Sequence, residues 1–114
     1  MQEIKGNLKE IVDKFKPLYR GLRKLEKEVS SRNPFPYVLK PLAMAGSRID
    51  IAFSSQSEDD FRKAKRDLEK AKEYYKLHDK GKIVEPHNIV IGMAEDLFRD
   101  YPTHYLLTRF GYKQ

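Results

Sequence analysis

The stretch SRIDIAFS, residues 47–54, alternates between apolar and other side chains along its length. This alternation predicts a β-strand, because successive side chains of a strand point to opposite faces of a sheet. One face of the strand would carry Ile49, Ile51 and Phe53, and the other Arg48, Asp50 and Ala52. No other part of the chain shows so clear a strand pattern, so the stretch predicts that the fold contains β structure.

The segment before this strand is rich in proline. NPFPYVLKP, residues 33–41, has three prolines within eight residues, which prevents a regular helix and discourages a central strand. We expect an extended, partly buried crossing here, with an edge strand around Tyr37–Leu39. The tripeptide AGS at residues 45–47 would then be a hairpin turn leading into Arg48–Phe53.

Residues 4–29 follow the pattern of an amphipathic helix. Apolar residues recur at alternating spacings of four and three, as on the seam of a coiled coil. This seam consists of Ile4, Leu8, Ile11, Phe15, Leu18, Leu22, Leu25 and Val29. Pro17 lies within it, so either one helix bends there or a second helix starts with Pro17 in its first turn. The unbroken register favours one bent helix.

A second long helix is predicted at residues 57–78. Ser57 and Asp60 have the spacing of a helix capping box, and the acids of SEDDF suit the positive end of a helix dipole. Gly81 is placed to end the helix. Its buried stripe would consist of Phe61, Ala64, Leu68, Ala71 and Tyr75.

The last third of the chain has two interpretations. One is a strand at residues 83–84 or 88–91, followed by a short helix from Met93 to Tyr101. The other is one helix starting near Asn88, with an apolar face that consists of Val90, Met93, Leu97 and Tyr101. The final segment THYLLTRFGYKQ, residues 103–114, would be a short helix or a last strand.

These elements predict an α+β fold in a single domain, residues 1–114. Two long amphipathic helices would pack on a small antiparallel sheet or hairpin, followed by a mixed C-terminal segment. There is no secretory signal and no apolar run of about 18 residues that could span a membrane. We therefore expect a soluble, cytoplasmic protein without a membrane partner.

The composition excludes several kinds of chemistry. The chain has no cysteine, which excludes disulfides, thiolate metal sites and cysteine nucleophiles. Its three histidines lack the spacing of metal ligands, and no glycine-rich phosphate loop is present. We expect no metal and no cofactor.

The net charge is +6, and residues 1–33 carry nine basic against five acidic side chains. Within the first helix, the face opposite the seam carries five cations and no acid between residues 16 and 27. These cations are Lys16, Arg20, Arg23, Lys24 and Lys27. Such a face can neutralise the phosphates of a nucleic acid, although it is also typical of a solvated helix.

The C-terminal segment mixes aromatic and basic residues. Arg109 and Tyr112 are candidates for contact with nucleic acid, because aromatic rings stack on unpaired bases and arginine binds phosphate. Together with His104 and His87, Arg109 would also suit acid–base chemistry on RNA.

Three classes of function follow from these features. The leading hypothesis is a small, basic, non-enzymatic binding protein that contacts nucleic acid, for example an accessory factor of a phage or plasmid. The second is a protein–protein adaptor or inhibitor that uses the heptad seam of the N-terminal helix and the NPFPYVLKP segment, or a homo-oligomer that pairs through the seam. The third is a small ribonuclease-like enzyme.

Overall fold

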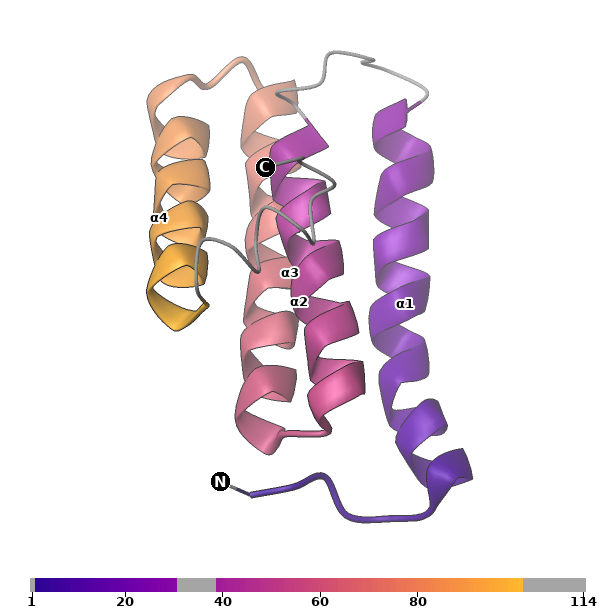
Figure 1. Ribbon diagram of the computed structural model, residues 1–114. Helices are drawn as coiled ribbons and strands as arrows, with labels where there is room; N and C mark the ends of the chain where they lie inside the picture. The colour runs from indigo at the N-terminus through magenta and orange to yellow at the C-terminus, as the bar shows by residue number, and fades with distance from the viewer. Residues whose placement is uncertain (1, 31–38, 102–114) are drawn as a thin grey trace, which may run out of the picture.

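The computed structural model describes residues 2–30 and 39–101, which form four helices. The helices are α1 (Leu8–Ser30), α2 (Lys40–Ser55), α3 (Glu58–Asp79) and α4 (Val84–Asp100). They stand side by side and run alternately up and down the molecule (Figure 1). α2 contacts each of the other three helices, and α1 and α4 lie on opposite sides of the molecule. The described residues are therefore an up-and-down helical bundle.

The prediction of an α+β fold is wrong, because residues 2–30 and 39–101 contain no sheet. The stretch 47–54 lies inside α2, and so does the AGS tripeptide for which we predicted a hairpin turn. Leu39, at the end of the predicted edge strand, is the N-cap residue of α2. The rest of that edge strand lies outside the described residues.

The error has a physical cause in the position of α2. On a helix with 3.6 residues per turn, side chains two residues apart point to nearly opposite sides. Ile49 and Ile51 are so spaced, yet both are buried, because α2 packs against α1, α3 and α4 at once. A helix buried on several sides has no single apolar stripe, and over a few residues its sequence resembles that of a strand.

α1 is one continuous helix that passes through Pro17, as the unbroken register favoured. From Ile11 to Val29, every residue of the predicted seam is buried. The first two positions differ: Leu8 is 70% exposed, and Ile4 is buried but precedes the helix. The helix begins only at Leu8 because Asn7 caps it, with its side chain accepting a hydrogen bond from the backbone of Glu10 (2.9 Å).

The backbone N–H of Ile4 donates instead to the carbonyl of Gln56, at the turn between α2 and α3. The short N-terminal segment is thereby held against the end of the bundle, and Ile4 reaches the core from outside the helix. The spacing of four between Ile4 and Leu8 is therefore not a helical one, although it continues the pattern of the seam.

The second long helix is confirmed as α3. Ser57 is its N-cap and accepts a hydrogen bond from the backbone N–H of Asp60, as the capping pattern predicts. All five residues of the predicted stripe are buried, and Asp67 and Tyr74 are buried with them. Gly81 follows the helix with a positive φ of 77°, a conformation that glycine adopts without strain.

The last third is helical, so both forms of the predicted strand, at 83–84 or 88–91, are wrong. One helix is observed, as in the second interpretation, but α4 begins at Val84, four residues before Asn88. Met93 and Leu97 are buried on its inner face, and Tyr101 is the C-cap residue. Residues 102–114 lie outside the described part of the chain.

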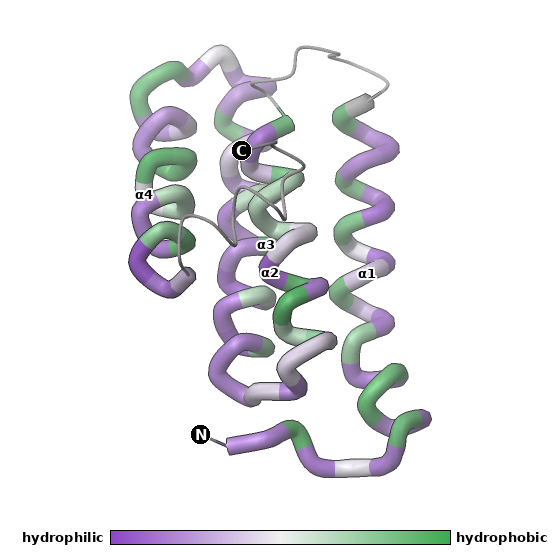
Figure 2. Tube along the Cα trace, in the orientation of Figure 1, coloured by the Kyte–Doolittle hydropathy of each residue, from purple (hydrophilic) through white to green (hydrophobic). Residues whose placement is uncertain are grey.

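The main core lies between α1, α2 and α3. Along α1, hydrophobic residues face the other helices and hydrophilic residues face away (Figure 2). A second, smaller cluster of Met44, Met93 and Leu97 joins α4 to α2. Among the described residues, no helix is both long enough and apolar enough to cross a bilayer.

Candidate functional site

The five predicted cations lie on the outer face of α1, and all are exposed. The structure places them there because the opposite face of the helix carries the buried seam. Lys16 forms an ion pair with Asp13, one turn earlier, with a distance of 2.9 Å between Nζ and the carboxylate. Arg20, Arg23 and Lys24 form no ion pair within the described part of the chain, so their charges face solvent directly.

A groove of about 580 Å³ separates the second half of α1 from α3. Lys24 from α1 lines it together with Lys72 and Lys76 from α3, so the cationic surface continues onto a second helix. Glu28 and Asp79 line the same groove, however. In this groove the cations are therefore mixed with acids, unlike those on the outer face of α1.

The other predicted site residues are placed as follows. Arg109, Tyr112 and His104 lie outside the described residues. His87 is exposed in the first turn of α4, and together with His78 it lines a groove of about 530 Å³. Within residues 2–30 and 39–101, no group of three or more histidine, aspartate or glutamate side chains could hold a metal ion.

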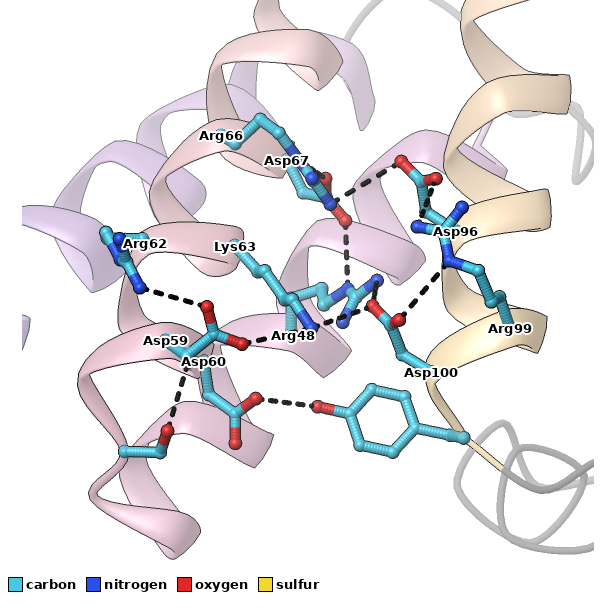
Figure 3. A network of polar contacts seen from close by, with 12 residues as sticks. Arg48, Asp59, Asp60, Arg62, Lys63, Arg66, Asp67, Asp96, Arg99 and Asp100 are labelled. Carbon is cyan, nitrogen blue, oxygen red and sulfur yellow. Dashed lines mark hydrogen bonds and ion pairs between the residues drawn. The ribbon is translucent and has the colours of Figure 1, made fainter. Parts of the chain in front are cut away.

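The sequence patterns did not predict the most extensive polar cluster, which links α2, α3 and α4 (Figure 3). At its centre is Arg48, whose side chain is only 1% exposed. Its Nε donates to a carboxylate oxygen of Asp67 at 3.2 Å, and its Nη2 donates to Asp100 at 2.9 Å. Arg48 therefore connects one carboxylate from α3 with another from α4.

Lys63 extends this cluster along α3. Its Nζ lies 3.1 Å from Asp100 and 3.2 Å from Asp59. Tyr101 adds two further contacts. Its hydroxyl donates to Asp60 at 3.2 Å, and the central carbon of the Arg48 guanidinium lies over its ring, 5.3 Å from the ring centroid. The end of α4 is thus attached to α3 by charge as well as by packing.

A second branch of the cluster surrounds Asp96 of α4. Its carboxylate lies 2.8 Å from Nη2 of Arg99 and 3.5 Å from Nη2 of Arg66. Lys70 is also within ion-pair distance, at 3.8 Å. Most cations of α3 are therefore paired with acids of α3 and α4. Arg20, Arg23 and Lys24 of α1, in contrast, have no such partner within the described residues.

Hydrogen bonds within the cluster keep Asp100 and Lys63 in their charged forms. Burial alone would raise the pKa of Asp100, but hydrogen bonds from Arg48 and Lys63 outweigh it, so the pKa is lowered. Burial would likewise lower the pKa of Lys63, but its bonds to Asp100 and Asp59 raise it. Burial and the nearby carboxylate of Asp60 raise the pKa of Tyr101 to about 12. None of these three groups changes its charge near neutral pH, which suits attachment of α4 and does not suit general acid–base catalysis.

One residue of this cluster, Asp67, could have been recognised from the sequence. Asp67 falls within the apolar stripe of α3, three residues after Ala64 and four before Ala71, and an acid at such a position needs a buried cationic partner. Arg48 gave no comparable signal, because the strand interpretation placed it on the polar face.

Over residues 2–30 and 39–101, the fold and the cluster define a four-helix bundle with a charged contact between α2, α3 and α4. A comparison of the chain with protein-family models, with curated proteins and with solved structures gives no match.

Proposed function

We propose that this protein binds nucleic acid without catalysing a reaction, and that it contacts phosphates through the outer face of α1. The observation that carries the proposal is the exposed set Arg20, Arg23 and Lys24, which has no carboxylate partner within the described residues. Lys16 and Lys27 extend the same face, so that cations recur on each turn, about every 5.4 Å along the helix. A cationic row of this kind is suited to a polyanion with regularly spaced phosphates.

The distribution of charge over the bundle supports the same conclusion. The cations of α3 that approach α4 are paired with Asp59, Asp96 and Asp100. The excess of positive charge is therefore concentrated on α1, on the side away from α4 (Figure 1). A one-sided field of this kind raises the association rate with an anionic partner.

The adaptor hypothesis has less support, because the seam that would contact another protein is occupied. From Ile11 to Val29 its residues are buried against α2 and α3 in the core of the same chain. A partner helix on this seam would have to displace them. The ribonuclease-like hypothesis depends on His104 and Arg109, which lie outside the described residues.

The proposal is tested by charge reversal on α1. The variant Arg20→Glu/Arg23→Glu/Lys24→Glu should lose most of its affinity for a nucleic acid, measured by fluorescence anisotropy at several salt concentrations. The slope of log K against log salt should become smaller by about 3, since each lost phosphate contact removes about one unit.

The matched control is Lys5→Glu/Lys80→Glu/Lys82→Glu, which changes the net charge equally but leaves α1 intact. It should retain its salt slope, and circular dichroism should show that both variants remain helical. If the α1 variant binds as tightly as the control, the proposed interface is wrong.

A further inference from the structure

A third groove, which lies between α1 and α2, borders the cationic face. Its volume is about 460 Å³, within the usual range of ligand pockets. It is lined by Val12, Phe15, Lys16, Tyr19, Arg20 and Arg23 of α1 and by Phe53 of α2. No acidic residue lines this groove, in contrast to the groove between α1 and α3.

One wall of the groove consists of two aromatic rings that the rest of the protein covers only in part. Tyr19 and Phe53 are half-buried, and their rings meet edge to face with centroids 6.3 Å apart. Phe53 in turn packs edge to face on the fully buried ring of Phe15, at 5.2 Å. The two outer rings are therefore supported from the core and hold a fixed position at the surface.

The hydroxyl of Tyr19 adds a second restraint, because it donates to Asp50 of α2 at 2.9 Å. The ring is thus held at both ends, by packing on Phe53 and by this hydrogen bond. A ring that is already ordered loses little conformational entropy when a planar group stacks on it. The wall is consequently a preorganised stacking surface.

The same groove brings these rings together with cations. Lys16, Arg20 and Arg23 line it, and they follow one another at intervals of four and three residues along α1. An aromatic surface flanked by a row of cations is how proteins bind single-stranded nucleic acids, with bases stacked on the rings and the backbone along the charges. In a duplex the bases are stacked inside, so the rings would have no planar partner.

We infer that the ligand of the α1 face is single-stranded nucleic acid, and that in this groove an unpaired base stacks on one of the two rings, Tyr19 or Phe53, and contacts the other at its edge, because the rings stand 77° apart. The inference rests on the proposed function, and it adds the class of ligand and the residues that select it. Arg20 and Arg23 would hold the phosphates on either side of the stacked base.

The test uses the full chain and one labelled oligonucleotide, as DNA and as RNA, in single-stranded and duplex form. Wild-type protein should bind a single strand more tightly than the duplex. The variant Tyr19→Leu/Phe53→Leu keeps apolar bulk but removes both rings, and it should lose about tenfold or more in single-strand affinity with little change for the duplex. Tyr19→Phe keeps the ring but removes its hydrogen bond to Asp50, so it should lose far less single-strand affinity than the double variant.

Phe98→Leu is the matched control, because Phe98 is an exposed aromatic residue on α4, on the side away from α1. It should leave both affinities unchanged. Equal binding of both forms by the wild type, or unchanged single-strand binding by Tyr19→Leu/Phe53→Leu, would overturn the inference but not the proposed function. If neither form binds to the wild type, the proposed function fails as well.

Discussion

At the scale of single residues, Arg48 is the most constrained side chain described. Its charge is almost fully buried, and removal of such a charge from water costs several kcal/mol unless partners compensate. Asp67 and Asp100 supply two such partners, whereas Nη1 of Arg48 has no hydrogen-bond partner within the described residues. The balance therefore depends on both carboxylates, and the loss of either one leaves a buried positive charge poorly matched.

We predict that Asp67→Ala lowers the free energy of unfolding by about 3–5 kcal/mol, because it leaves Arg48 buried without its α3 partner. The double variant Arg48→Met/Asp67→Leu should cost clearly less than the two single substitutions combined. Urea denaturation at neutral pH measures both effects.

Glu69→Ala, which breaks an exposed ion pair with Lys72, is the comparison and should change stability by less than about 1 kcal/mol. An Asp67→Ala variant as stable as Glu69→Ala would show that the buried pair does not hold the helices together.

At the scale of elements, α1 and α3 were predictable, because each carries a single apolar stripe. In α3 the cap at Ser57 and the apolar stripe at a period of 3.6 residues both predict the helix, and the structure confirms them. The same reasoning failed for α2, because Ile49 and Ile51 are both buried although they lie on different sides of the helix. Its burial depends on three other helices, and no local pattern contains that information.

The glycines within the helices allow a matched prediction about stability. A side chain at Gly92 of α4 would meet nothing within 4 Å, whereas a Cβ atom at Gly21 of α1 would lie 3.2 Å from Cδ2 of Leu68. We predict that Gly92→Ala raises the free energy of unfolding by about 0.5–1 kcal/mol, because alanine loses less backbone entropy in a helix. Urea denaturation measures the gain.

Gly21→Ala has the same intrinsic gain, but its Cβ atom requires the Leu68 side chain of α3 to give way by a few tenths of an ångström. Its net effect should therefore be smaller than that of Gly92→Ala or destabilising. Equal gains at the two positions would mean that the contact between α1 and α3 at Leu68 is not tight.

At the scale of the whole molecule, charge is divided between two sides. Acids of α3 and α4 pair with buried and half-buried cations, and this attaches α4 to a bundle whose apolar contact with it is small. On the other side, Arg20, Arg23 and Lys24 of α1 are exposed and form no ion pair within the described residues. The sequence is rich in both acidic and basic residues. Where α3 and α4 meet, these charges stabilise the fold, and on α1 the basic residues support the proposed binding.

The attachment of α4 predicts how stability depends on pH. The pKa of Asp100 is lower in the folded protein than in the unfolded chain, where it is about 3.9. Its contribution is therefore complete above about pH 4 and is lost as the pH falls through the folded pKa. Urea denaturation should show a smaller loss of stability between pH 7 and pH 3 for Asp100→Asn than for the wild type.

Glu95→Gln is the control for this comparison, because Glu95 is an exposed acid on the same helix and lies outside the cluster. It should retain the pH dependence of the wild type. The same pH dependence in Asp100→Asn as in the wild type would show that Asp100 does not couple α4 to protonation.

The sequence by itself determined the extent of α3, the continuity of α1 through Pro17 and the cations on its outer face, because each follows from local periodicity and capping. Only the tertiary structure decided that residues 47–54 are helical, that Arg48 is buried between Asp67 and Asp100, and that Tyr19 and Phe53 meet beside the cations. The last two features join residues that are far apart in the chain, and the first depends on the packing of α2 against three other helices. They arise where helices pack, and the energy of packing and of buried charge can outweigh the preferences of a short local stretch.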